Sequence, residues 1–202
     1  MEFDKLADEE KVQSIVDILA KNGIESFVVN SGAEAKEKLY ELIPEGSEIM
    51  EASSTTMDEI GVTKELLEGS RYKSLRKKIM GVNDKAERDA YRKSVLGHAY
   101  AIGSVHAVTE QGQLVVASAS GSQIGSYAYG ADHLVLVIGT QKVVKNLDSA
   151  FERIEKYIFP LEDARMKKTF GFGSVIAKIL IISKEIVPGR TKVIFVKEKF
   201  GF

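Results

Sequence analysis

The feature that most constrains the fold is the run His133–Ile138, which is almost wholly apolar and ends at Gly139. Such continuous runs are typical of strands buried on both faces, whereas half-exposed strands alternate. Two further short strands are predicted at Ile24–Val29 and Ser47–Glu51, with a helix between them. Strand, helix and strand with short links favour a parallel sheet covered by helices. We therefore predict a three-layer α/β/α fold with a mostly parallel open sheet, in which these three segments are neighbouring interior strands.

Other segments complete this prediction. Helices are expected at residues 5–22, at Asp84–Leu96, and after Asn146 with an end at Pro160. Ala99–Thr109 and Gln113–Ala117 predict a hairpin. The final strands are expected at Ala177–Ser183 and Lys192–Val196. Because the 202 residues contain no repeat, low-complexity segment or linker, residues 1–202 are interpreted as one domain.

Composition limits the classes of protein that fit. The formal net charge of −1 favours neither nucleic acid nor an anionic membrane as a partner. The absence of cysteine excludes disulfides, thiolate catalysis and cysteine-ligated clusters within this chain. The apolar runs are too short to span a bilayer, and the acidic start Met1–Asp4 is unlike a signal peptide. The simplest expected compartment is the cytoplasm, and association into a homo-oligomer is left open.

Two loops rich in hydroxyl groups follow predicted strands and precede short predicted helices. The first loop comprises Ser53, Ser54, Thr55 and Thr56. The second loop contains Ser118, Ser120, Gly121, Ser122 and Gln123. Helix N-termini carry free N–H groups and partial positive charge, and small residues let an anion approach the backbone. These nine residues are therefore candidates for binding a phosphate or carboxylate, and the alternative is that both loops are ordinary helix caps.

Other chemistry has weaker support. His98, His106 and His133 show no metal-binding spacing, so no metal site is predicted. No nucleophile elbow and no phosphate-binding loop ending in Gly-Lys-Ser/Thr is present. The basic cluster around Arg71–Lys78 is interpreted as a solvated helix face, with contact to a substrate phosphate or partner as the alternative.

Several motifs together resemble the LUD domain of lactate-utilisation proteins. They are Thr109–Val115, Ala117–Gln123, Tyr127–Ala131 and Val137–Val144. The tail, with Pro188-Gly189-Arg190 and Phe200-Gly201-Phe202, resembles small stand-alone members of that family. The resemblance extends over most of the chain and is strongest in the second half.

At the level of fold, the LUD family is similar to ribose-5-phosphate isomerase, formyltetrahydrofolate cyclo-ligase and the CoA-transferases. In CoA-transferases a glutamate in a Glu-x-Gly turn is the nucleophile, and Glu110-Gln111-Gly112 is similar. The resemblance thus implies Glu110 as a catalytic acid, base or nucleophile on the rim of the pocket. The alternative is an exposed hairpin residue.

Two functions from different classes fit these observations. In the first, the chain binds a small carboxylate or phosphate metabolite in a crevice lined by serine, threonine and glycine, with or without catalytic turnover. Alternatively, it is a non-catalytic accessory subunit of an iron–sulfur lactate-oxidising complex, because the resemblance implies that LUD subunits accompany iron–sulfur partners. The sequence identifies no cofactor.

Overall fold

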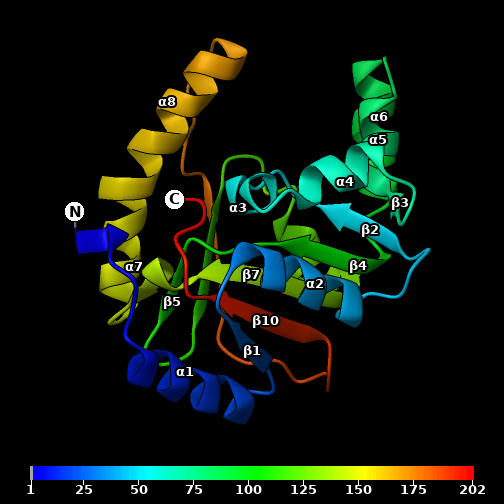
Figure 1. The fold of residues 1–202 in the computed structure, drawn as a ribbon. Helices are drawn as coiled ribbons and strands as arrows, with labels where there is room; N and C mark the ends of the chain where they lie inside the picture. The colour runs from blue at the N-terminus through cyan, green and yellow to red at the C-terminus, as the bar shows by residue number, and fades with distance from the viewer. Residues whose placement is uncertain (1) are drawn as a thin grey trace.

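A six-stranded parallel sheet forms the centre of the computed structural model, which describes residues 2–202 (Figure 1). All its strand pairs are parallel. In spatial order the strands are β1 (Glu25–Val29), β10 (Thr191–Val196), β7 (Ala131–Gly139), β4 (His98–Gly103), β2 (Glu48–Glu51) and β3 (Lys73–Ser74).

Strand β7 is buried on both faces from Leu134 to Gly139, as its sequence predicts, whereas Asp132 and His133 near its start are exposed. Leu134, Leu136 and Ile138 pack into one apolar cluster, whereas Val135 and Val137 pack into another on the opposite face. Its neighbours β4 and β10 hold it in parallel register, for example through Ala101 opposite Leu134. The alternation of side chains along a strand thus supplies two hydrophobic cores from one continuous apolar run.

Helices cover both faces of this sheet, so the predicted α/β/α class is confirmed. On one face lie α2 (Gly32–Leu42), α3 (Thr55–Glu59) and α4 (Val62–Glu68). On the other face lies α1 (Glu9–Lys21), which contributes Val12, Ile15 and Leu19 to the core. Aspartate and serine N-caps, such as Asp8 and Ser31, start the two long helices α1 and α2.

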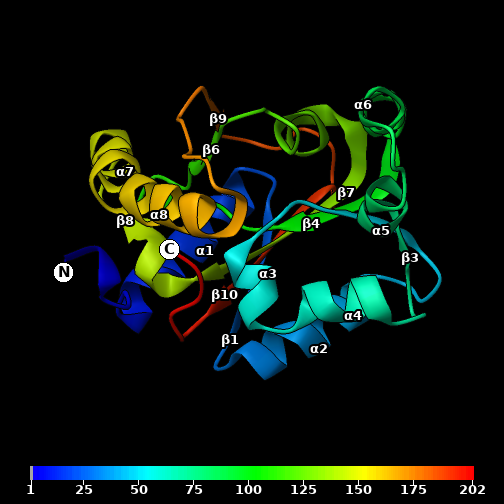
Figure 2. The same ribbon diagram turned by 90° about the horizontal axis from the view of Figure 1, so that it is seen from above.

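A second, four-stranded sheet shares the face that α1 covers. Its strands lie in the order β8 (Val143–Val144), β5 (Ala107–Thr109), β6 (Leu114–Ser118) and β9 (Lys178–Ile182). Figure 2 shows β6 and β9 on one side of β4 and β7, and α3 and α4 on the other. Helix α7 (Leu147–Arg153) and the π-helix η4 (Ile154–Ile158) pack on the second sheet, where Ala150 and Ile154 meet Ala107 and Val115.

Two expectations about the strands are wrong in detail. The three strands predicted as neighbours are separated, since β10 lies between β1 and β7, and β4 lies between β7 and β2. The predicted single strand Ala99–Thr109 is two strands, because the chain leaves the central sheet after Gly103 and joins the second sheet at Ala107. Local pattern reveals a strand, but pairing across the sheet depends on distant segments.

Pro160 does not end a helix, contrary to the expectation from sequence. Helical structure continues from α7 through η4 into α8 (Phe159–Phe170). Proline lacks an N–H group and its ring clashes with the carbonyl four residues earlier in a regular helix. Here the preceding turn is widened into a π-helix, with the Phe159 N–H bonded to the Ile154 carbonyl. The wider turn accommodates the ring and lets the helix continue.

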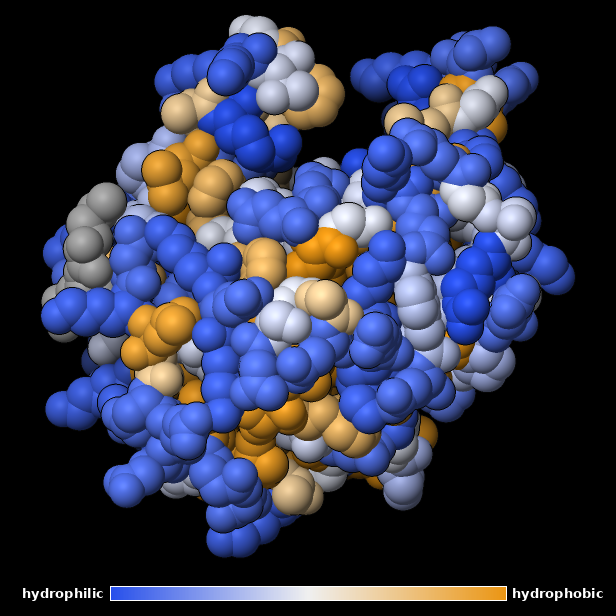
Figure 3. All heavy atoms as spheres, viewed as in Figure 1, coloured by the Kyte–Doolittle hydropathy of each residue, from blue (hydrophilic) through white to orange (hydrophobic). Residues whose placement is uncertain are grey.

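Two helical arms project beyond the sheets. One is α8, and the other contains α5 (Leu75–Met80) and α6 (Lys85–Ser94). Neither α6 nor α8 contains a buried residue. Figure 3 shows the two projections separated by an open notch. The short segments η1 (Glu2–Asp4), η2 (Ser126–Gly130) and η3 (Thr140–Lys142) complete the described elements.

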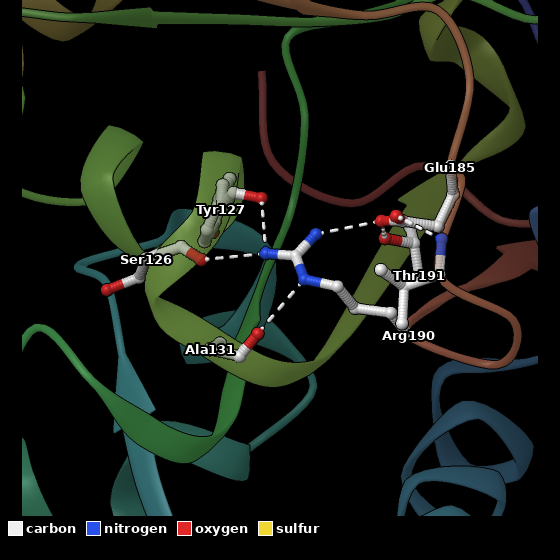
Figure 4. Close-up of polar contacts among 7 residues, drawn as sticks. Ser126, Tyr127, Ala131, Glu185, Arg190 and Thr191 are labelled. Atoms are coloured by element: carbon white, nitrogen blue, oxygen red, sulfur yellow. Dashed lines mark hydrogen bonds and ion pairs between the residues drawn. The ribbon is translucent and has the colours of Figure 1, made fainter.

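Arg190 fastens the π-helix η2 to the start of β7 (Figure 4). Its Nε donates to the carbonyl of Ala131 at 3.0 Å, and Nη2 donates to the carbonyls of Ser126 and Tyr127 at 3.3 and 3.0 Å. Its Nη1 lies 2.8 Å from the carboxylate of Glu185, which also accepts from Thr191. A buried guanidinium thus ties two carbonyls of η2 to the first carbonyl of β7.

We expect Arg190→Met to lower the free energy of unfolding by about 3–5 kcal/mol, because it leaves the carboxylate of Glu185 buried without its cationic partner. Urea titration followed by circular dichroism measures the change. The control is Arg92→Met, which removes an exposed ion pair with Asp89 and should change stability by less than about 0.5 kcal/mol. Equal effects of the two substitutions would contradict the role given to Arg190.

Candidate functional site

A cavity of about 260 Å³ lies at the carboxyl ends of β2, β4 and β7, where ligands commonly bind in open α/β sheets. Its walls come from the loops after these strands, the loop after β6, the helix α8 and the last residues described. The lining includes Ser53, Ser54, Thr55, Thr56, Asp58, Ser104, His106, Ser118, Ser120, Gln123, Tyr127, Lys142, Glu162, Arg165, Met166, Gly201 and Phe202.

Both hydroxyl-rich loops line this cavity, although they come from different sheets. All four residues of the first loop contribute, together with Ser118, Ser120 and Gln123 of the second. Gly121 and Ser122 are not part of the lining. The second loop follows β6, an antiparallel strand of the smaller sheet, rather than a strand of the central sheet. The structure therefore brings the loops together by packing one sheet on the other.

Much of the hydrogen-bonding capacity of the second loop is used internally. The N–H of Gly121 donates to Ser118 Oγ at 2.8 Å, and the N–H of Ser122 donates to Ser120 Oγ. The hydroxyl of Ser118 donates in turn to Gln123 Oε1 at 2.9 Å. The expected cradle of free N–H groups at Gly121 and Ser122 is thus occupied by serine side chains. Gly121 itself has φ +84°, a conformation that favours glycine.

In the first loop, Ser54 acts as the N-cap of the short helix α3, accepting from the N–H of Met57. Ser54 is therefore an ordinary helix cap, which is the alternative considered from the sequence, although its loop lines the cavity. Thr56 is buried, and its hydroxyl donates to the carbonyl of Phe200 at 3.3 Å. This bond brings the end of the described chain against the cavity.

Glu110 lies apart from this cavity. It occupies the turn between β5 and β6 and is not among the lining residues. Its carboxylate pairs with Lys11 Nζ of α1 at 3.0 Å, on a partly exposed surface. The structure does not bring Glu110 to the rim beside the two loops, because the hairpin turn points toward α1. A catalytic role for Glu110 stays a prediction.

Lys142 is a buried lysine that lines the cavity. It follows β7 in η3 and is only 3% exposed. Its Nζ donates to Thr56 Oγ1 at 2.9 Å and to Ser104 Oγ at 3.1 Å, which joins residues that follow β2, β4 and β7. No carboxylate lies within 4.0 Å of this amine in residues 2–202. Burial, reinforced by the charge of Arg153, lowers the pKa of Lys142 to about 7.

Arg153 places a second buried cation behind the cavity wall. The side chain is fully buried, its Nη1 donates to the carbonyl of His106 at 2.6 Å, and its plane lies over the ring of Tyr157. Its Nε and Nη2 have no hydrogen-bond partner among the described residues. Burial lowers the pKa of Arg153 to about 10, so it stays charged at neutral pH.

His106 and Tyr127 contribute neutral polar groups to the lining. His106 Nδ1 accepts from the N–H of Ala117 at 3.1 Å, which assigns its proton to Nε2. Burial and the charges of Lys142 and Arg153 lower the pKa of His106 to about 3, so the ring is uncharged. Burial raises the pKa of Tyr127, whose phenol therefore keeps its proton. A Cβ at Gly103 would lie 1.8 Å from this hydroxyl, so glycine is required there.

The outer wall of the cavity belongs to the arm α8. Arg165 donates from Nε and Nη2 to both carboxylate oxygens of Glu162 at 2.7 Å. This half-buried bidentate pair is neutral as a unit, and Asp58 also lines the cavity. The cation of the lining without a carboxylate partner is therefore Lys142.

The other candidates from sequence lie elsewhere or remain without a ligand role. Residues 2–202 contain no cluster of histidine, cysteine, aspartate or glutamate placed to hold a metal. In the basic cluster, Arg71, Arg76 and Lys78 pair with Glu45, Glu51 and Glu48. None of these three lines the cavity. No helix in the described part of the chain is long and apolar enough to cross a membrane.

Sequence reasoning missed Lys142, Arg153 and Tyr127. Lys142 carried a usable signal, because Thr140-Gln141-Lys142 directly follows Gly139 at the carboxyl end of the most buried strand. Such positions are where ligands meet parallel sheets. Arg153 carried no signal, since it lies on a helix among ordinary charged residues and its burial depends on the second sheet.

The chain belongs to the LUD domain family, whose model matches residues 12–196. That family is related to lactate-utilisation proteins. A solved structure of a DUF162 family protein from Deinococcus radiodurans is similar, with 11% sequence identity and a TM-score of 0.55. The alignment covers 95% of this chain and 99% of that chain. At this identity the likeness shows the fold alone. Among curated proteins, none matches the chain.

The lowered pKa of Lys142 makes stability depend on pH. The unfolded chain binds this proton up to the ordinary pKa of 10.5, whereas the folded chain releases it near 7. Between these values the unfolded state binds more protons, so the free energy of unfolding should rise with pH by up to about 1.4 kcal/mol per unit. Urea titrations of the wild type and Lys142→Met from pH 7 to 10 measure the slope. Identical slopes would contradict the assignment.

Proposed function

We propose that the cavity binds a small carboxylate or phosphate, with Lys142 as the cation that meets it. The observation that carries this proposal is the pair of buried cations, Lys142 and Arg153, neither of which has a carboxylate partner among the described residues. A buried charge is costly unless it is paired. An anion in the cavity beside Lys142 would supply the missing partner of that lysine, and the charge of Arg153 behind the wall would favour it.

The remaining lining supports a small polar ligand. Hydroxyl groups of Ser53, Thr55 and Ser120 surround the entrance, and Tyr127 and His106 can donate to oxygen atoms of a ligand. The cavity volume of about 260 Å³ suits a metabolite of a few heavy atoms, since drug-sized ligands occupy about 300–1,000 Å³. Membership of the LUD family, related to lactate-utilisation proteins, favours a 2-hydroxy or 2-oxo acid within this class.

Binding of an anion should depend on the protonation of Lys142. We expect oxalate, whose charge is constant from pH 6 to 9, to bind most tightly below pH 7. The affinity for oxalate should fall by up to about tenfold per pH unit above 7, because Lys142 loses its proton in the protein without bound oxalate. Isothermal titration calorimetry measures the affinity at each pH. At a hundred times the dissociation constant, oxalate should stabilise the fold by about 2.7 kcal/mol.

Two variants accompany this measurement. Lys142→Met should weaken oxalate binding at pH 6 by at least about tenfold, because truncating one partner of a buried charge pair costs about 2–5 kcal/mol. Lys178→Met is the control, since Lys178 is exposed beside the second loop, does not line the cavity, and donates from Nζ to the carbonyl of Ala119. Oxalate affinity that is independent of pH, or unchanged in Lys142→Met, would contradict the proposal.

Substitutions at Ser120 and Glu110 test ligand binding and catalytic turnover separately. Ser120→Trp should abolish oxalate binding, because Ser120 lines the cavity and a bulky side chain there fills its mouth. Glu110→Gln should change oxalate affinity by less than about twofold, since its carboxylate lies outside the lining and pairs with Lys11. Loss of an identified activity in Glu110→Gln with intact binding would instead support the catalytic role predicted from sequence.

A second candidate function is that of an accessory subunit beside iron–sulfur proteins. The observation that favours it is the apolar surface at the end of the arm, where the neighbouring rings of Phe170 and Phe172, 6.0 Å apart, are 57% and 59% exposed. Exposed apolar clusters commonly mark protein contacts. Co-purification of cysteine-rich subunits that is lost in a Phe170→Ser, Phe172→Ser variant would support this candidate, and unchanged recovery would count against it.

A further inference from the structure

The amine of Lys142 is placed as a nucleophile requires. It opens into the cavity, and its two hydrogen-bond partners, Thr56 Oγ1 and Ser104 Oγ, are neutral hydroxyls. A lysine held by a carboxylate remains an ammonium ion without a lone pair, but this lysine has no such neighbour within 4.0 Å in residues 2–202. Lysines activated as nucleophiles are desolvated in this way and lie near other cationic groups.

The electrostatic surroundings point in the same direction. Burial and the nearby guanidinium of Arg153 lower the pKa of Lys142 to about 7, so a large fraction of the amine is neutral at physiological pH. The carboxylate of Glu59 acts in the opposite sense and is the weaker influence. His106 faces the same cavity as an uncharged ring, so it adds no positive charge there.

Groups that can move protons surround the amine. The hydroxyl of Thr56 donates to the carbonyl of Phe200, so its oxygen presents a lone pair to Nζ. Tyr127 lines the cavity with a phenol that burial keeps protonated. Gly201 also lines the cavity and approaches so closely that a Cβ there would lie 3.1 Å from Nζ, so the missing side chain leaves room beside the amine. Because Lys142 is only 3% exposed and lines the cavity, a reacting molecule would reach its amine through the cavity.

We propose that Lys142 forms an imine with small aldehyde acids or 2-oxo acids that enter the cavity, an inference that rests on the proposed anion site. The neutral nitrogen attacks the carbonyl carbon, a C–N bond forms as the carbonyl π bond breaks, and one proton passes from the nitrogen to the carbonyl oxygen. The C–O bond then breaks and the hydroxyl leaves as water with the second proton of the nitrogen, so amine and carbonyl yield a neutral imine and water. When this imine takes up a proton from solvent, the substrate's own carboxylate stabilises the charge.

The test uses the full chain with glyoxylate as the probe and sodium cyanoborohydride to reduce the imine to a stable secondary amine. Peptide mapping by mass spectrometry then locates the carboxymethyl groups. At pH 7 we expect Lys142 to be modified at least about tenfold faster than the exposed Lys178, because the lowered pKa of Lys142 leaves a large fraction of its amine neutral. Excess oxalate should protect Lys142 and leave Lys178 unprotected.

Oxalate binding to the wild type, measured without glyoxylate, separates this inference from the anion site. Lys142→Arg should show no oxalate-protected adduct, since arginine forms no such imine. If oxalate binds the wild type and Lys142 is modified no faster than Lys178, the imine is refuted and the anion site stands. If oxalate neither binds nor protects, both proposals fail.

Discussion

The burial of β7 on both faces is the constraint on which the rest of the structure depends. A strand with no exposed face must be paired along both edges and covered above and below, which requires β4 and β10 beside it and helices on one side. The other side is covered jointly by α1 and the smaller sheet. Because the central strands are parallel, the loops that follow them gather at one edge. The cavity exists where the smaller sheet adds the loop after β6 to that edge.

The sequence predicts those parts that depend on local pattern. The apolar run of β7, the capped helices and the turn at Glu110–Gly112 follow from side-chain periodicity and turn chemistry. The order of the strands does not, because β10 reaches its place between β1 and β7 from the far end of the chain. The sequence wrongly predicts a helix end at Pro160 for a related reason. The π-helix that accommodates this proline lies in the preceding residues, whose sequence shows no clear π-helix signal.

The candidate site likewise has features that the local sequence predicts and features that depend on tertiary packing. The hydroxyl-rich loops are visible in the sequence, and packing does bring them together. What the sequence conceals is which groups are already satisfied. Ser118 and Ser120 take up the N–H groups of Gly121 and Ser122, so the expected cradle is filled from within. The unsatisfied charge lies instead at Lys142 and Arg153, and their burial is a property of tertiary packing that residue type does not reveal.

The helix that continues through Pro160 has a mechanical consequence for the cavity. Its first part, α7 and η4, is anchored by Ala150, Ile154 and Ile158 in the core beneath the smaller sheet, whereas α8 has no buried residue. The helix is thus packed into the core only at its base, so the part of the cavity lining that Glu162, Arg165 and Met166 form is less constrained by packing than the part at the buried Lys142. For the proposed ligand, this difference would make selection strict at the anionic end and permissive toward the length of the remainder.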